Sequence, residues 1–368
     1  MKNSYNTRQL RALTFLAFLV PIMRIVPRFS AREAGSGAWC APFIALPFIL
    51  LYIYFLSAPL SGRNQGEGLG EMLLRSGGNV FGKAVLFITG LFALFYCGFV
   101  LRSGADRFIS TIYTSGSPWP FVFIMLILAL FAVFGPKKAL VRTAKIFLPL
   151  LLLVLIAVLI FSFTTIDAGL LLPLSHGDII PLLKAAFPIL NVSVGMLAFS
   201  AFLETECEPE FHRTKSYILW FLPICLLISA IIAAIVGNYG APLTAKLTNP
   251  FFTIIRDVSL FNTIERIEAF MVALWVFPDF IVTGLTMIVA QHSLRLCFGL
   301  NPNLGKGLKN GRWIILLDAA IIGAVALILP QDSAKMLKLS ELYVPIAGLS
   351  LTALLYPLCF AVGKLRKR

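Results

Sequence analysis

One apolar run constrains this chain more than any other feature of its sequence. Residues 146–163, IFLPLLLLVLIAVLIFSF, contain no charged side chain. A helix needs about 20 predominantly apolar residues to cross a bilayer, and this run is long enough with its flanks. Of the 368 residues, 59% are hydrophobic and only 13% are charged, against about 25% charged in a typical soluble domain. The chain is therefore predicted to be an all-α polytopic membrane protein, because a helix satisfies its own backbone polar groups in lipid.

Apolar runs separated by charged or Gly/Pro-rich segments predict ten transmembrane helices. The first run follows a basic segment, as in a signal peptide. We interpret it as a retained span, because Arg24 interrupts it and no small-residue cleavage site follows. The predicted spans lie near 12–27, 39–60, 80–101, 119–135, 146–166, 181–203, 217–237, 264–290, 313–329 and 342–362.

The placement of Lys and Arg predicts the orientation of the spans. With the N-terminus in the cytoplasm, the gaps on the cytoplasmic side hold 20 of these residues and the gaps on the outer side hold 8. This distribution obeys the positive-inside rule and predicts that both termini are cytoplasmic. The net charge of +14 is then explained by topology and by attraction to anionic lipid, without a nucleic-acid partner.

Motifs for catalysis, metals or nucleotide cofactors are not found in the sequence. The six cysteines show no CxxC spacing, the three histidines are far apart, and there is no Walker motif or GxGxxG loop. We therefore predict neither an enzyme nor a site for a metal or another cofactor.

The number of spans favours an internal repeat. Ten spans can form two inverted five-helix halves, as in many secondary transporters, whose substrate sites use broken helices at matching positions. We expect one membrane domain over 1–368, with repeats at about 12–166 and 181–362. Span one contains Pro21 and Pro27, and span six contains Pro188. Because proline removes a backbone donor, both spans are predicted to be interrupted near mid-membrane, although prolines are also common in continuous membrane helices.

Polar, small and aromatic residues near these positions are candidates for ligand binding. Arg24 lies about 18 Å along its helix from the start of the span, past the middle of a core about 30 Å thick. It either offers its guanidinium to a ligand carboxylate or extends to the interface. For Tyr96 in span three, ordinary packing is the alternative. The candidates are Pro21, Arg24, Tyr96, Asn191, Ser193, Gly195 and Glu204.

Span eight begins with an unusual group of charges, in TIERIEAFMVALWVFPDF at 263–280. At 100° per residue, Glu265, Glu268, Trp275 and Asp279 fall within an arc of about 80°. Such a stripe is typical of a helix that faces protein or water rather than lipid. We expect Glu268 and Trp275 to face the bundle interior and Arg266 to pair with an acid on another helix or loop. The alternative is that the charges only mark the membrane interface.

Two of these segments carry a family resemblance. AGSGAW at 34–39 and ERIEAFMVALWV at 265–276, together with length and span number, resemble the spore germination permease family. Its members are the B subunits of nutrient germinant receptors, within the amino acid/polyamine/organocation transporter superfamily. The resemblance implies a LeuT/APC-like fold, a nutrient pocket near mid-membrane, and assembly with an A subunit and a C lipoprotein in the spore inner membrane. The expected structural or coupling residues are Pro27, Trp39, Glu265, Arg266, Glu268, Trp275 and Asp279.

The chain departs from the pattern of that family in three places. PIMRI in span one has no glycine, Phe202-Leu203-Glu204 stands where a Gly-aromatic-Glu element is common, and Ser36 and Gly37 stand where an acid is common. These differences leave the identity of the ligand open. The expected function is a permease-like receptor subunit that binds a small, amino acid-like nutrient. The alternative is a free-standing, cation-coupled amino acid transporter, with the hydroxyls of Thr283 and Thr286 as candidate sodium ligands.

Overall fold

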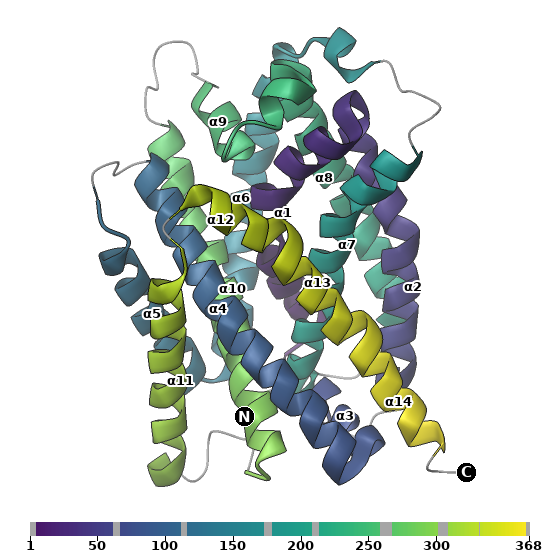
Figure 1. Ribbon diagram of the computed structural model, residues 1–368, viewed down its shortest axis with the longest axis vertical. Coiled ribbons are helices and arrows are strands. Elements are labelled where there is room, and N and C mark those ends of the chain that lie inside the picture. Colours follow the sequence, from purple (N-terminus) through teal and green to yellow (C-terminus); the bar gives the residue numbers. More distant parts are fainter. Residues whose placement is uncertain are drawn as a thin grey trace.

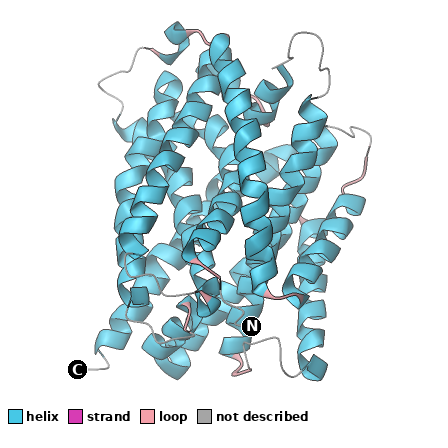
Figure 2. Cartoon of the chain, turned by 180° about the vertical axis from the view of Figure 1, so that it is seen from behind, coloured by secondary structure: helices cyan, strands magenta, loops and turns pink. Residues whose placement is uncertain are grey.

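The computed structural model describes residues 5–61, 67–111, 116–172, 179–207, 213–257, 267–300, 308–330 and 332–365. Glu265 and Arg266 lie outside these residues, and so does the pairing expected for Arg266. Within them the chain is almost entirely helical (Figure 2), and the one isolated β-bridge joins Tyr5 to Cys207.

All ten predicted spans are present as helices, and the α-helical fold class is confirmed. Seven described helical stretches are long and apolar enough to cross a membrane, and two shorter apolar helices accompany them. One of the seven, Thr7–Leu60, holds two spans. The spans are α1 (Thr7–Ala34), α2 (Ala41–Ser61), α3 (Leu69–Gly77) continued by α4 (Lys83–Thr111), α5 (Trp119–Phe134), α6 (Lys137–Thr164), α7 (Ile179–Ala201), α8 (Arg213–Thr244), α10 (Ile267–Cys297), α11 (Leu308–Ile328), and α12 (Ser333–Lys338), α13 (Val344–Leu349) and α14 (Tyr356–Leu365) in one last span.

The turn between the first two spans depends on a glycine. Gly35 ends α1 with a φ of 57°, a conformation that side-chain-bearing residues rarely adopt. A 3-10 segment, η1 (Gly35–Cys40), then leads into α2. The chain therefore reverses direction within a few residues and separates the two predicted spans.

The predicted interruptions of spans one and six are wrong. α1 runs through Pro21 and Pro27, and α7 runs through Pro188, as continuous helices. Each proline removes only one backbone donor, and α1 and α7 pack closely against each other and against further helices, so the freed carbonyl groups remain covered by protein. The helical geometry changes only after Ala201, where α7 continues as the 3-10 segment η4 (Phe202–Glu206).

The third span is longer than predicted. A π-helical segment, η2 (Gly78–Gly82), joins α3 to α4, and the helix continues to Thr111. Arg102 and Arg107 lie beyond the predicted span 80–101 and are among the eight residues of the predicted outer gaps, but in the structure they lie inside α4, and both are buried. The last span also contains π-helical segments: η5 (Leu339–Tyr343) joins α12 to α13, and η6 (Ser350–Leu355) joins α13 to α14.

The helix packing has a two-fold pattern. Within the first half α1 packs on α6, and within the second half α7 packs on α13 in the same way. Between the halves, the contact of α4 with α11 is matched by that of α10 with α5. Likewise α2 contacts α7 while α8 contacts α1. Each contact has a counterpart in which every span is replaced by the span at the same position of the other half. This is the pattern of two inverted five-helix repeats. The repeat limits at about 12–166 and 181–362 remain a prediction.

The centre of the bundle is formed by α1, α4, α7 and α10. Most of α1 is buried, and α4 and α10 approach closely, since a Cβ added at Gly90 would lie 2.6 Å from Leu294. α5 and α6 instead expose large apolar side chains such as Phe131 and Ile146, as expected for a surface in contact with lipid. The N-terminus and the C-terminus lie at the same end of the bundle, and α12, α13 and α14 cross it obliquely (Figure 1).

Candidate functional site

A small internal cavity lies where α4, α7 and the last span meet. Its volume is about 20 Å³, which is room for about one water molecule. It combines an aromatic wall with a few polar groups, the usual composition of a small-molecule site. The lining residues are Phe92, Tyr96, Asn191, Val192, Gly195, Met196, Phe199, Val344, Gly348 and Thr352.

The polar group that most clearly lacks a partner is Asn191. Its Oδ1 atom is buried and accepts no hydrogen bond within the described residues. Opposite it lies Gly348, where an added Cβ would be 2.8 Å from that oxygen. On the same face of α7, a Cβ added at Gly195 would meet no atom within 4 Å. Buried polar atoms in proteins nearly always have a partner, so the Asn191 carbonyl is an acceptor left for a water or a ligand.

Three aromatic rings form the apolar wall of the cavity. Phe92 stacks on Tyr96 with ring centroids 5.9 Å apart, and Phe199 meets both rings edge-on at 6.2 and 6.5 Å. These distances are those of favourable aromatic pairs. The rings come from α4 and α7, two helices of the central bundle, so they form a rigid surface for the apolar part of a ligand.

Arg24 approaches the same region from α1. Its guanidinium carbon lies 4.6 Å from the ring centroid of Phe99, a cation–π contact. Tyr96, Asp106, Arg107 and Asp279 are close enough to interact with its charge. No hydrogen bond or ion pair joins Arg24 to a carboxylate among the described parts of the chain, and the side chain is only half-buried. A guanidinium is thus held beside the cavity wall without an anionic partner.

The neighbouring charges are already paired. Arg107 donates to Asp279 in an ion pair whose side chains are 4% and 3% exposed. Arg102 donates through Nε to Asp106 at 2.8 Å. Each of these guanidiniums therefore has its own carboxylate. Together with Arg24, the three arginines and two aspartates carry one positive charge in excess. This excess resides on Arg24 and favours an anionic ligand group.

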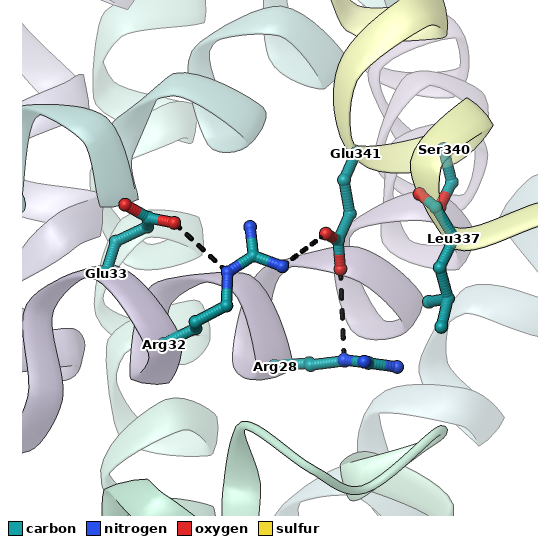
Figure 3. A network of polar contacts seen from close by, with 6 residues as sticks. All are labelled: Arg28, Arg32, Glu33, Leu337, Ser340 and Glu341. Atoms are coloured by element: carbon teal, nitrogen blue, oxygen red, sulfur yellow. Dashed lines mark hydrogen bonds and ion pairs between the residues drawn. The ribbon is translucent and has the colours of Figure 1, made fainter. Parts of the chain in front are cut away.

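An ion-pair cluster lies near the Gly35 end of α1 (Figure 3). Arg32 of α1 donates to Glu341 of η5 at 2.6 Å, and the Nε atom of Arg28 lies 3.9 Å from the same carboxylate. Glu33 holds Arg32 from the other side at 3.1 Å. Val344, one turn after Glu341, lines the cavity. The cluster therefore ties α1 to the span that closes the cavity.

A second cluster lies toward the end of the bundle where the termini lie. The Nε2 atom of His292 on α10 lies 2.8 Å from the Glu71 carboxylate on α3. Lys137 of α6 donates to Thr205 of η4 at 3.2 Å, and the Tyr5 hydroxyl donates to the Leu203 carbonyl. These contacts involve five segments, namely α3, α6, η4, α10 and the residue Tyr5 ahead of α1. The cavity therefore lies between two sets of polar contacts that link separate spans.

The structure brings together three of the seven predicted ligand residues: Tyr96, Asn191 and Gly195 line the cavity. Arg24 lies beside it. Pro21 and Ser193 are buried but do not line it, and the Ser193 hydroxyl has no partner within the described residues. Glu204 is buried in η4, beyond the end of α7.

The residues expected to have structural roles occupy several different places. Trp275 is buried against Phe251 and Phe252 of α9 (Pro250–Asp257). Pro27 is buried in α1, and the Trp39 carbonyl accepts a hydrogen bond from Ser229 at 2.7 Å. Glu268 belongs to α10, but its side chain is outside the described part.

Sequence reasoning missed the residues that complete the site. Phe92, Phe199, Gly348 and Thr352 have no local signature, since aromatic and small residues are common in membrane helices. The partner of Asp279 was missed as well, because Arg107 was assigned to a loop. A third span predicted to extend to Thr111 would have placed Arg102 and Arg107 within the helix, where both are buried.

Comparison with known proteins finds a matching family and a relative of similar length. A family model described as "Spore germination protein" matches residues 6–336. Spore germination protein A2 of Bacillus subtilis (strain 168) is 23% identical over 285 residues, covering 75% of this chain and 76% of that protein.

Two solved transporter structures share the fold. Mhp1, a nucleobase-cation-symport-1 family transporter in a closed conformation with bromovinylhydantoin bound, superposes with a TM-score of 0.64 at 13% identity, over 98% of this chain and 78% of that one. MhsT in complex with L-phenylalanine gives a TM-score of 0.61 at 16% identity, over 98% and 89%. These likenesses confirm the LeuT/APC-like architecture.

Proposed function

Because the chain belongs to the spore germination permease family, we propose that it is the permease-like B subunit of a nutrient germinant receptor. It binds a small amino acid-like nutrient in the cavity between α4, α7 and α13. The observation that carries this proposal is the unpartnered carbonyl of Asn191 in the cavity, beside a guanidinium, Arg24, that has no carboxylate of its own.

The arrangement fits a zwitterion. Arg24 can hold the ligand carboxylate through a charge-assisted hydrogen bond. The Oδ1 atom of Asn191 can accept from the ammonium group, and the ring of Tyr96 packs against the apolar part. A nutrient with a bulky cation in its side chain would add to the positive excess around Arg24, so neutral side chains are favoured.

The small volume of the cavity links binding to movement. A space of about 20 Å³ holds a water molecule but no amino acid, so the nutrient enters only if the last span moves away from α4 and α7. A ligand that binds the opened form shifts the population toward it. The last span contains two π-helical segments, which often mark functional sites in helices. Its displacement is the signal passed to the partners, the A subunit and the C lipoprotein.

The location follows from the same proposal. The receptor lies in the inner membrane of the spore with both termini in the cytoplasm, in agreement with the distribution of Lys and Arg. Germination in a strain that lacks this gene tests the role: the response to one nutrient should be lost. Normal germination of that strain on amino acids, sugars and nucleosides, with other receptors also deleted, would contradict it.

The free-standing transporter is the alternative that the shared fold keeps open. The hydroxyls of the two candidate sodium ligands donate to backbone carbonyls of α10, Thr283 to Asp279 at 2.7 Å and Thr286 to Val282 at 2.9 Å. They can still offer lone pairs to a cation. Uptake of labelled amino acids into proteoliposomes that contain only this chain separates the two functions, because a receptor subunit binds without sustained flux.

A further inference from the structure

A large groove opens on the flank of the bundle between α2 and the last span. Its volume is about 840 Å³, far larger than the internal cavity. Phe48, Leu51 and Tyr54 on its α2 wall are between 49% and 66% exposed, so the groove opens toward the surrounding bilayer. Its lining is apolar or aromatic except near one end, and includes Phe55, Pro59, Leu349, Ala353, Pro357 and Phe360.

The polar end of the groove is basic. Arg75 and Lys364 line it there, on α3 and α14, at the end of the bundle where the termini lie (Figure 1). Arg75 donates to Glu67 at 2.8 Å, and Lys364 is exposed. Three further basic residues, 366–368, follow Lys364 in the sequence after a single leucine, Leu365. Basic clusters beside the end of a spanning helix attract anionic lipid headgroups.

The length of the groove distinguishes a lipid from a protein helix. Its α2 wall runs from Phe48 to Pro59, about 16 Å at 1.5 Å per residue. A spanning helix of a partner would need a surface about as long as the 30 Å hydrocarbon core. The groove covers about half of that depth, which is the depth of one leaflet.

We propose that this groove binds an anionic glycerophospholipid of the bilayer, with an acyl chain along the apolar walls and its phosphate at Lys364 and Arg75. The lipid packs against the outer side of the wall that encloses the nutrient cavity. On α7, Leu190 and Val194 line the groove, whereas their neighbours Asn191 and Gly195 line the cavity. On the last span, Leu349 lines the groove and the adjacent Gly348 lines the cavity. The lipid therefore supports the helices that form the cavity, and this site does not depend on the identity of the nutrient.

Native mass spectrometry of the purified full chain tests the proposal. The chain is stripped of endogenous lipid in detergent and titrated with phosphatidylglycerol or phosphatidylcholine of equal chain length. We expect one retained phosphatidylglycerol, bound at least tenfold more tightly than phosphatidylcholine. Ala353→Trp fills the groove and should abolish retention, whereas Leu354→Trp, at the adjacent position that is 60% exposed, should retain it.

The headgroup is tested separately from the acyl chain. Lys364→Gln should lower the preference for phosphatidylglycerol at least threefold and leave phosphatidylcholine unchanged. Lys215→Gln, at an exposed lysine of α8 that does not line the groove, is the matched control. Equal retention by Ala353→Trp and Leu354→Trp would overturn the proposal, as would an equal headgroup preference in both lysine variants. The absence of retained phosphatidylglycerol in the parent chain would also overturn it.

Discussion

Asn191 of α7 faces Gly348 of the last span so closely that a Cβ at position 348 would lie 2.8 Å from the Asn191 side-chain oxygen. The other neighbour of that position, Phe92, is 3.5 Å away. The acceptor of the cavity is thus available only because residue 348 has no side chain.

The first prediction follows from this contact. Gly348→Ala should turn the Asn191 amide away and lower the affinity for the nutrient about tenfold, because one ligand hydrogen bond is lost and the cavity narrows. The fold should be kept, since a flexible amide can move aside. Germination as a function of nutrient concentration measures the effect. Gly323→Ala is the control, because its added methyl would meet only Leu126 at 3.4 Å; equal responses of the two variants would contradict the assignment.

A second prediction concerns the carboxylate of the nutrient. Arg24→Gln removes the guanidinium, and a hydrogen bond between charged groups contributes about 1.5–3 kcal/mol. Affinity should fall about 10- to 100-fold, with little change in protein abundance. Binding of labelled amino acids to the purified chain measures it. Arg256→Gln, at a side chain that is 64% exposed, should bind normally, and an unaltered affinity in Arg24→Gln would remove Arg24 from the site.

The buried pair of Arg107 and Asp279 should affect stability rather than affinity. Removing one partner leaves a buried charge and typically costs about 3–5 kcal/mol. Arg107→Met should therefore lower the unfolding temperature and the abundance of the chain, and Arg107→Met/Asp279→Leu should recover much of the loss. The exposed pair of Arg256 and Asp257, 3.9 Å apart, should contribute about 0–1 kcal/mol. Equal losses from breaking the two pairs would show that burial does not govern their strength.

The last span should separate more readily from α1 when Glu341 loses its charge. Glu341→Gln weakens the contacts to Arg28 and Arg32, so a cysteine placed in the cavity as Thr352→Cys should react several times faster with a membrane-impermeant maleimide. Glu33→Gln is the control, because the ion pair of Glu33 with Arg32 lies within α1 and, among the residues that the structure describes, links it to no second helix. The six native cysteines set the background, measured without Thr352→Cys. Identical rates in both variants would show that this ion pair does not restrict access.

The sequence predicts the architecture well because lipid imposes it locally. Each span must be apolar and helical over about 20 residues, so runs such as 146–163 identify their own structure. The continuity of α1 and α7 was not predictable from Pro21, Pro27 and Pro188, because the effect of a proline depends on whether neighbouring helices cover the freed carbonyl group. That cover comes from packing between α1 and α7, which lie far apart in the sequence.

The site was predictable only in part for the same reason. Tyr96 and Asn191 are unusual enough within apolar spans to attract notice. Gly348 acquires its role only through its contact with Asn191, and no periodicity in either span reveals this contact. Likewise, Arg107 is separated by 172 positions from Asp279. Pairings across the bundle are properties of the assembled helices rather than of any one segment.

Thermal unfolding of the purified chain, measured with each of the common amino acids, tests the central claim most directly. A ligand at about 100 times its Kd stabilises the folded state by about 2.7 kcal/mol. We expect at least one amino acid to raise the unfolding temperature of the parent chain and of Gly323→Ala, and to have no effect on Asn191→Leu. An equal rise for Asn191→Leu, or no rise with any amino acid in a folded parent chain, would contradict the nutrient site between α4, α7 and α13.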